Sequence, residues 1–386
     1  MNIVFLSPHF PPNFYHFCVA LRQQGVNVLG IADAPWEELR PELRAALTGY
    51  YRTDLNDYDR LLRACGHFIH QYGRLDRVES HNEFWLETEA QLRQDFNISG
   101  VRPDSIAKVT LKAQMKQGFQ QAGIEVARGR VVKSLAEAQQ FAAEIGFPAV
   151  VKPDRGVGAA STYRVNNPQE LERVFADQSS VDVIMEEFIQ GSIHSFDGLT
   201  DRDGRIVFST SHVFSQGIME TVNEDRDIFY YSQREIPADL EAAGLKAVQA
   251  FDIREKFFHI EFFRTEPDNR IVAIEVNMRP PGGLTMDMFN FANNIDLYRE
   301  WANIVVHNRF SGDYNRPYHC AYIGRKLRNH YVHDHDEIMR SYGRQIVHHE
   351  PINSVFSAAL GNFGYLARAE ELDELLALGR FIQATA

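Results

Sequence analysis

The sequence predicts a mixed protein, α/β in its N-terminal part and α+β in the remainder. A strand, a helix and a second strand alternate over residues 2–31, and this order builds a parallel open sheet. Two long strands within residues 258–276 flank a Glu-Pro-Asp-Asn turn, which is typical of a hairpin. Between these regions, helical and strand patterns are interleaved without an internal repeat.

Length and composition place the chain among globular proteins. Its 386 residues are 44% hydrophobic and 24% charged, enough for two or three domains with sizeable cores. The net charge of −12 argues against a nucleic-acid surface, although a local cluster of cations can still hold a nucleotide. Three widely spaced cysteines, Cys18, Cys65 and Cys320, predict reduced thiols and a cytoplasmic location. With no signal-peptide pattern and no apolar run of about 18 residues, we expect no membrane contact.

We expect a first domain over residues 1–104. Its predicted elements are the strand Asn2–Leu6, the helix Phe14–Gln24 capped by Asn13, the strand Val26–Ile31, the helix Asp57–Tyr72, the strand Arg77–Ser80 and the helix His81–Phe96. No G-x-G-x-x-G follows the first strand, so no dinucleotide site is predicted. Gly100, Pro103 and Asp104 mark the domain boundary.

A second domain is expected over residues 105–187 and a third over residues 188–386. The second is predicted to contain a helix that carries Lys112, then Ile124–Val132 (strand), Leu135–Ile145 (helix), Ala149–Lys152 and Thr162–Val165 (strands), Pro168–Ala176 (helix) and Val181–Glu186 (strand). The third is predicted to contain the strands Ser192–Thr200 and Ile206–Thr210, the helix Pro237–Ala250, the long hairpin, the helix Asn293–Val306 and a C-terminal extension of two or three strands and two helices.

The long hairpin carries the first candidate site. Alternation in the strand Phe258–Arg264 puts Glu261 on one face, and Glu275 and Asn277 are expected to point the same way from the partner strand. Two carboxylates and an amide oxygen suit a hard divalent cation such as Mg²⁺. Arg279 follows two residues later. Either glutamate alone could be an exposed residue of a half-solvated hairpin, but the set of Glu261, Glu275, Asn277 and Arg279 together indicates a metal site.

Two further motifs indicate a nucleotide-binding site. Lys152 ends an apolar strand and precedes a loop with Gly156 and Gly158, where backbone N–H groups and an ammonium can cradle phosphate. The strand Val181–Glu186 ends before Phe188, and free backbone groups at a strand end can pair with the edge of adenine. Lysines at strand ends and linkers of this kind are common, so each motif alone leaves a purely structural role open.

Taken in order, these motifs resemble the ATP-grasp superfamily. They are a lysine ten residues before Ala122-Gly123, the Pro-Ala-Val-Val-Lys-Pro strand with its glycine loop, the Glu-Glu-Phe-Ile-x-Gly segment and the Glu-x-Asn-x-Arg run. The resemblance is greatest to the branch of biotin carboxylase, carbamoyl-phosphate synthase and carboxylate–amine ligases. It spans about residues 112–306 and implies an ATP-grasp fold, here preceded by a Rossmann-like parallel-sheet domain.

The resemblance implies roles for individual residues. Lys112 and Lys152 match the lysines that contact the α- and β-phosphates of ATP, and the loop with Gly156 and Gly158 matches the lid over them. The adenine hinge is matched by Glu186, Glu187, Phe188 and Ile189. Two Mg²⁺ or Mn²⁺ ions are expected on Glu261, Glu275 and Asn277. Lys152 and Arg279 are the expected catalytic residues, with Arg279 steadying the transferred phosphoryl group.

The chain departs from the family pattern at several positions. Ile193 stands where many ligases have a glutamate for the ribose hydroxyls, and the next residue, His194, matches a histidine of biotin carboxylase-like members, so ribose contact is expected from His194. Leu111 replaces an aspartate before the first lysine. The lid contains Ala159-Ala160 where glycine is more usual, which predicts a stiffer loop.

The resemblance implies a ligase that activates a small-molecule carboxylate as an acyl phosphate and joins it to an amine, releasing ADP and phosphate. One alternative is a carboxylase or carbamoyl-phosphate-type enzyme that uses bicarbonate, and another is a non-catalytic ATP-binding regulatory protein. A homodimer is a family expectation. Substrate specificity is expected from loops such as Ser215–Asp227, and His9 and Glu83 are candidates for the substrate cleft.

The C-terminal extension contains two charged sets with a less specific signal. Arg325, Lys326 and Arg328 are suited to a substrate carboxylate but equally to a solvated surface. The histidines resemble a metal cluster, although an Asp-rich helix start is the simpler interpretation; they are His330, His333, His335, His348 and His349.

Overall fold

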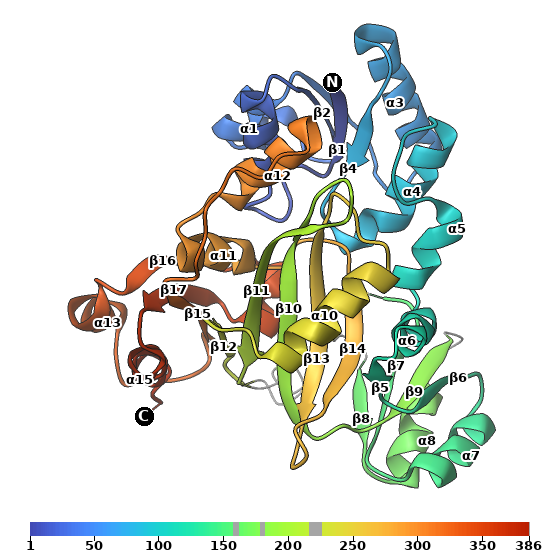
Figure 1. Cartoon of the computed structure of the whole chain (residues 1–386), viewed down its shortest axis with the longest axis vertical. Helices are drawn as coiled ribbons and strands as arrows, with labels where there is room; N and C mark the ends of the chain where they lie inside the picture. Colours follow the sequence, from blue (N-terminus) through green and yellow to red (C-terminus); the bar gives the residue numbers. More distant parts are fainter. Residues whose placement is uncertain (157–161, 178–181, 216–225, 386) are drawn as a thin grey trace.

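The computed structural model describes residues 1–156, 162–177, 182–215 and 226–385. Its strands form three sheets: a four-stranded sheet at the N-terminus, a four-stranded sheet at the far end of the molecule and a nine-stranded sheet between them (Figure 1). This arrangement confirms the predicted mixed fold. In the described part of the chain, no helix is long and apolar enough to cross a membrane.

The N-terminal sheet is parallel, as the β-α-β order predicted, with strand order β3-β2-β1-β4. Its elements are β1 (Asn2–Leu6), α1 (Tyr15–Gln23), β2 (Asn27–Ala32), α2 (Pro41–Ala46), β3 (Gly49–Arg52), α3 (Tyr58–Tyr72), β4 (Arg77–Glu79) and α4 (Leu86–Asp95), with 3₁₀ turns at Trp36–Glu38 and Glu83–Trp85. The central strands β1 and β2 are almost wholly buried because helices cover both faces of the sheet, as expected of a parallel sheet, whereas the edge strand β3 is only partly buried. Asn13 does not cap α1; its side chain reaches the carbonyl of Gly283 at 3.2 Å instead.

The distal sheet is antiparallel, with strand order β6-β9-β7-β8. Its elements are β6 (Gly129–Val132), α7 (Leu135–Ile145), β7 (Ala149–Pro153), β8 (Tyr163–Val165), α8 (Pro168–Asp177) and β9 (Val183–Glu187). Ser134 caps α7 by accepting a hydrogen bond from the Glu137 amide. Helices α7 and α8 pack against the distal sheet around a small core that includes Phe141, Val151 and Met185. From here on we call this whole unit the lid, and the loop that begins at Gly156 the lid loop.

The central sheet has the strand order β16-β17-β15-β12-β11-β10-β13-β14-β5. Its strands are β5 (Glu125–Val126), β10 (Gly191–Thr200), β11 (Ile206–Phe214), β12 (Phe229–Ser232), β13 (Phe257–Thr265), β14 (Ile271–Asn277), β15 (His319–Arg325), β16 (Ile346–Pro351) and β17 (Phe363–Ala369). Its helices are α5 (Pro103–Ile106), α6 (Lys112–Gln121), α10 (Ala238–Ala250), α11 (Thr285–Asn293), α12 (Leu297–His307), α13 (His335–Tyr342), α14 (Ser357–Leu360) and α15 (Leu372–Ile382), with 3₁₀ turns at Ala107–Val109 and Ser354–Phe356.

Two features of the central unit differ from the predicted pattern. The helix expected over Asn293–Val306 begins only at Leu297, as α12, because Asn294 adopts a left-handed conformation that ends the preceding helix α11 at Asn293. Residues Glu125–Val126, expected in the second domain, pair with β14 in the central sheet. The domain boundaries at 104/105 and 187/188 otherwise stay predictions.

The N-terminal domain is fastened to the central sheet by buried charges and a shared apolar core. Lys256, the residue before β13, forms an ion pair with Glu79 at the end of β4, and Arg77 lies 3.2 Å from the same carboxylate. Phe17 of α1 packs against Trp301 of α12 in that core. The carboxyl edge of the N-terminal sheet is therefore held beside the carboxylate-bearing hairpin.

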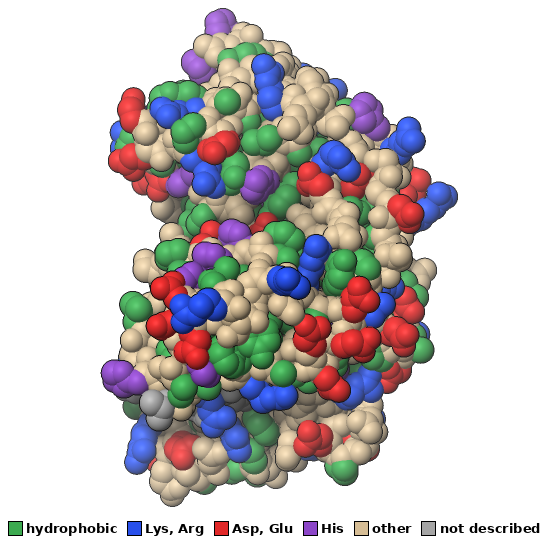
Figure 2. Space-filling view, turned by 90° about the vertical axis from the view of Figure 1, so that its left-hand side faces the viewer, with side chains coloured by type: hydrophobic (Ala, Val, Ile, Leu, Met, Phe, Trp, Pro, Cys, Tyr) green, Lys and Arg blue, Asp and Glu red, His purple; other side chains and the backbone are tan. Residues whose placement is uncertain are grey.

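The surface carries charges of both signs. On the face shown in Figure 2, Lys and Arg side chains are interspersed with Asp and Glu side chains, and apolar groups lie between them. This face therefore carries mixed charge rather than a continuous patch of one sign.

Candidate active site

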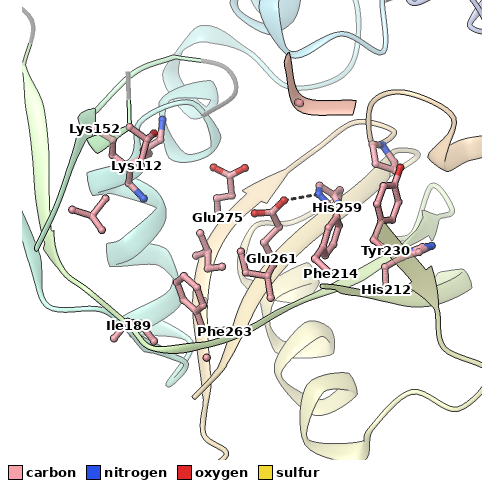
Figure 3. A pocket seen from close by; sticks show the side chains of 18 of the residues that line it. Lys112, Lys152, Ile189, His212, Phe214, Tyr230, His259, Glu261, Phe263 and Glu275 are labelled. Atoms are coloured by element: carbon pink, nitrogen blue, oxygen red, sulfur yellow. Dashed lines mark hydrogen bonds and ion pairs between the residues drawn. The ribbon is translucent and has the colours of Figure 1, made fainter. Parts of the chain in front are cut away.

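A cavity of about 470 Å³ lies between the lid and the central sheet. Most of the residues predicted to bind a nucleotide line it, together with residues that the sequence did not suggest. The residues that line it on the lid and hinge side are Lys112, Ala127, Val150, Lys152, Thr162, Glu186, Glu187, Phe188, Ile189, Gln190, Gly191 and Ile193. Glu261 and Glu275 lie at its centre (Figure 3).

The paired carboxylates come from neighbouring strands, as predicted. Glu261 of β13 is directly opposite Glu275 of β14 in the register, and directly opposed side chains have Cβ atoms about 5 Å apart. The Asn277 amide donates to Glu275 at 3.0 Å. Burial opposes the negative charge of Glu275, but this hydrogen bond and the nearby cations, Lys112 first, lower its pKa. Glu275 therefore stays ionised at neutral pH.

The predicted alternation of β14 is wrong at one point. The register shifts beside Glu261, so that Glu275 and Ala273 oppose consecutive residues of β13 and Ile274 is the extra residue. This bulge lets the consecutive residues Ile274 and Glu275 both line the cavity. Val276 belongs to the apolar core, and Ala273 contacts both the core and the cavity. A bulge cannot be read from alternation, because it depends on how the partner strand pairs.

Lys152 is held by a carboxylate. Its Nζ lies 2.7 Å from Glu186, whose other oxygen lies 2.6 Å from Lys116 Nζ. Burial opposes the charge of Lys152, but Glu186, and more weakly Glu275 and Glu261, raise its pKa. Burial likewise opposes the charge of Glu186, yet the two lysines lower its pKa to about 2. Glu186 was expected in the adenine hinge, but its side chain is the counter-ion of Lys152. The sequence did not suggest that Lys116 shares this carboxylate.

The remaining hinge residues lie along the edge of the cavity. The Phe188 amide donates to the Pro148 carbonyl at 3.3 Å, and the Arg164 guanidinium lies 4.3 Å from the Phe188 ring centre. Glu187 lies 2.6 Å from Arg128. Ile189 points into the cavity below the lysines (Figure 3).

Lys112 begins α6 and faces the same space. Its Nζ donates to the Gly156 carbonyl at 3.2 Å, which brings the helix start to the first glycine of the lid loop. The second glycine, Gly158, lies outside the described residues, as does the Ala159-Ala160 pair.

The structure does not bring His194 to the cavity. In β10 the neighbouring Ile193 lines it, and alternation turns the His194 side chain to the opposite face, where His194 Nε2 lies 3.1 Å from Ser192 Oγ. The ribose contact expected from the resemblance is therefore unsupported for His194. The apolar Ile193 occupies the corresponding position on the cavity side.

Arg279 is paired with the N-terminal domain. Its Nη2 and Nε donate to Glu83 at 2.5 and 3.0 Å, and its Nη2 also lies 3.4 Å from Asn277 Oδ1. Glu83, a candidate for the substrate cleft, thus reaches the site through Arg279. His9 lies 3.7 Å from Asp33 and does not line the cavity.

A buried chain of charges beneath Glu261 was missed by the sequence reasoning. His259 lies 2.9 Å from Glu261 through Nε2 and 2.5 Å from Asp197 through Nδ1. Burial opposes a positive charge, but the two carboxylates, Asp197 first, raise the pKa of His259 to about 10. His259 is therefore an imidazolium that donates to both. His212 completes the chain, 2.8 Å from Asp197.

The C-terminal extension contributes the far wall of the cavity. Phe356, Ala359 and Leu360 line it together with Phe214 and Tyr230. No local signal in the sequence identified these residues, because the segment reaches the site only through the pairing of β12 with β15 and of β15 with β17.

The other charged groups of the extension have local partners. His335 lies 2.9 Å from the Tyr365 hydroxyl, and His333 lies 3.0 Å from Glu337. Arg325 donates to the His333 carbonyl at 2.8 Å. Among the residues that the structure describes, no group of three or more His, Cys, Asp or Glu side chains is arranged to hold a metal ion.

The fold and the sequence together define the class of protein. A family model described as an ATP-grasp domain matches residues 145–287, which run from the end of α7 through β14 to the start of α11. The chain therefore contains an ATP-grasp domain, preceded by a parallel-sheet N-terminal domain of the Rossmann-like type.

Individual proteins of this class are similar to the chain. The L-arginine-specific L-amino acid ligase of Bacillus subtilis is 26% identical over 254 residues, which cover 62% of this chain and 60% of that protein. Among solved structures, an L-amino acid ligase from Bacillus licheniformis has a TM-score of 0.77 at 17% identity, covering 98% of this chain and 96% of that one. N5-carboxyaminoimidazole synthetase from Staphylococcus aureus, complexed with ADP, has a TM-score of 0.73 at 13% identity, covering 97% and 95%.

Proposed function

We propose that this protein is an ATP-dependent ligase. It activates a small-molecule carboxylate as an acyl phosphate, joins that acyl group to an amine and releases ADP and phosphate. The observation that carries the proposal is the cross-strand pair of Glu261 and Glu275, which shares one cavity with Lys112, Lys152 and Arg279. The similarity to amino acid ligases supports the same reaction class.

The lid and hinge side of the cavity suits ATP. Lys152 and Lys112 provide positive charge for the phosphates at the strand end and the helix start. Phe188 and Ile189 provide apolar surface for a purine beside the end of β9. Glu186 forms ion pairs with both Lys116 and Lys152, and so holds the Lys152 ammonium in place. Because one negative charge is shared by two lysines, positive charge remains for the phosphates.

The central carboxylates fit Mg²⁺ or Mn²⁺. Glu261 and Glu275 supply carboxylate oxygens, and Asn277 supplies an amide oxygen, which is the donor set that hard cations prefer. His259 fixes one oxygen of Glu261 from below. When bound, two such ions offset the repulsion between the phosphates and an anionic substrate.

The chain's own residues account for the positioning of the reactants. Arg279 carries planar paired donors that suit a carboxylate or a phosphoryl group. Glu83 orients those donors from the N-terminal domain. Lys152 remains protonated beside Glu186 and stabilises negative charge as it develops in the transition state. Orientation and charge stabilisation of this kind are the main catalytic means in phosphoryl transfer.

A screen of ADP release tests the proposal. The whole chain is incubated with Mg-ATP and pairs of amino acids or other carboxylates and amines, and ADP and product mass are recorded. ADP that depends on both partners, with a condensed product, supports the ligase. ADP with bicarbonate alone indicates the carboxylase-type alternative, and ATP binding without turnover indicates a regulatory protein. The homodimer expected from the resemblance is checked separately by sedimentation of the same preparation.

A further inference from the structure

The cavity continues beyond the paired carboxylates into a second space. In Figure 3, Glu261 and Glu275 lie between the two lysines on one side and His212, Phe214 and Tyr230 on the other. In the central sheet, β11 is two strands from β13 and β12 is three strands from it, which corresponds to about 10 and 14 Å. We call this space the apolar compartment and define it by Phe214, Tyr230, Gly283, Thr285, Phe356 and Leu360, which all line the cavity.

The two hydroxyl groups that define it are already hydrogen-bonded. The Tyr230 hydroxyl lies 2.8 Å from Thr285 Oγ1, and Thr285 Oγ1 donates to the Gly282 carbonyl at 2.9 Å. His212, at its edge, is held by Asp197 through Nδ1, while its buried Nε2 has no hydrogen-bond partner among the described residues. Among the described residues that line this side of the cavity there is no carboxylate, and its cation is Arg279 at the boundary with the metal carboxylates.

The walls of the apolar compartment are tightly packed. A Cβ atom placed on Gly283 would meet Leu360 Cδ1 at 2.5 Å, so Leu360 lies directly against the loop that follows Arg279. Phe356 is backed by Phe10 of the N-terminal domain, with ring centres 5.4 Å apart and planes 7° from parallel. The size of the compartment is therefore set by large apolar side chains, of which Phe356 is backed by the N-terminal domain.

We propose that the apolar compartment binds the side chain of an α-amino acid substrate and selects a large, uncharged, apolar one. The inference rests on the proposed function, which brings the substrate carboxylate to Arg279 and the paired glutamates. From that point the side chain extends along the sheet toward Phe214 and Tyr230. A guanidinium or ammonium placed there would lose its hydration without a carboxylate partner among the described lining residues, whereas an apolar group is favoured by burial.

The test compares amino acids that differ only in the side chain. ADP release by the whole chain is measured with alanine, leucine, methionine, phenylalanine, lysine and arginine, each paired with a common set of amine acceptors. We expect kcat/KM for the best of leucine, methionine and phenylalanine to exceed those for alanine, lysine and arginine by about 10-fold or more. A preference for arginine, lysine or alanine would overturn the inference while leaving the ligase reaction intact.

Two variants and a binding measurement distinguish this inference from the proposed function. Leu360→Ala is expected to shift the preference toward larger side chains by about 10-fold, whereas Leu376→Ala, partly buried in the same extension but outside the cavity, is expected to leave it unchanged. Calorimetric titration of the same amino acids into the ADP-loaded chain reports binding without turnover. Tighter binding of apolar amino acids without ADP release supports the compartment and contradicts the ligase. Equal binding of all six contradicts the compartment.

Discussion

Lys152 Nζ lies 2.7 Å from Glu186 Oε2, inside the cavity and at the end of a lid strand. Both side chains are about one-tenth exposed. A buried pair of this kind needs each partner, because removing one leaves the other charge without compensation. Here the carboxylate also serves Lys116, so Glu186 is the central member of a three-residue cluster.

Glu186→Gln is expected to destabilise the protein by about 3–5 kcal/mol, because it leaves two buried lysines without a carboxylate. Denaturant unfolding at pH 7 measures the difference. Glu187→Gln is the matched control, since it pairs with a largely exposed Arg128, where such a pair contributes about 0–1 kcal/mol. Equal effects of the two substitutions would contradict the role assigned to Glu186.

The same cluster predicts an acid-dependent loss of stability. The pKa of Glu186 is about 2 in the folded protein against an ordinary 4.5, so its stabilisation of about 3 kcal/mol is present above pH 4.5 and is lost as the pH falls toward 2. The free energy of unfolding, followed from pH 6 to pH 3, should fall more steeply in the wild type than in Glu186→Gln. Parallel profiles would show that another carboxylate controls this range.

Lys152→Met is expected to reduce turnover by about 10²–10³-fold, by analogy with the loss of one charge-stabilising donor in a transition state. The fold should survive, since Glu186 keeps Lys116 as a partner. ADP release is compared with that of Lys133→Met, an exposed lysine of the lid unit. Turnover close to that of the wild type would refute the assignment of Lys152.

Arg279→Lys is expected to lower turnover by about 10²-fold, because an ammonium cannot reproduce the paired planar donors. Glu83→Gln should have a smaller effect, since the amide oxygen still accepts a hydrogen bond from Arg279. Steady-state kinetics with ATP and the carboxylate varied in turn measure both. A larger loss for Glu83→Gln than for Arg279→Lys would indicate that Glu83 contacts the substrate itself.

Asp197→Asn is expected to weaken activation by Mg²⁺ by about 10–100-fold, the usual result of losing a residue that orients a metal ligand. Asp197 orients the expected metal ligand Glu261 through His259, which donates to both carboxylates. The Mg²⁺ concentration for half-maximal ADP release measures the effect. Asp203→Asn, in the exposed turn after β10, is the control. An unchanged Mg²⁺ requirement would limit Asp197 to a structural role.

Local patterns predicted the parts of the site that lie close together in sequence. The hairpin over Phe257–Asn277 placed Glu261 beside Glu275 because alternation and pairing follow from short-range geometry. The strand that contains Lys152 and a helix that carries Lys112 were predicted for the same reason, although the structure begins that helix at Lys112 itself. Two details of single strands were predicted wrongly. The bulge at Ile274 depends on how β14 pairs with β13, and His194 lies on the face of β10 opposite the cavity.

The sequence alone determined the parallel start of the N-terminal sheet and the hairpin with its two carboxylates, because each depends on residues within a few dozen positions. It also determined the resemblance to ATP-grasp proteins, because each motif is short and the order of the motifs can be read along the chain. Tertiary structure alone decided that Glu83 meets Arg279, 196 residues away, that Asp197 and His259 underlie Glu261, and that Leu360 closes the far wall. These contacts arise when the strands of one sheet and the domains around it pack together. Packing depends on the combined shape and charge of distant segments, which no local pattern contains.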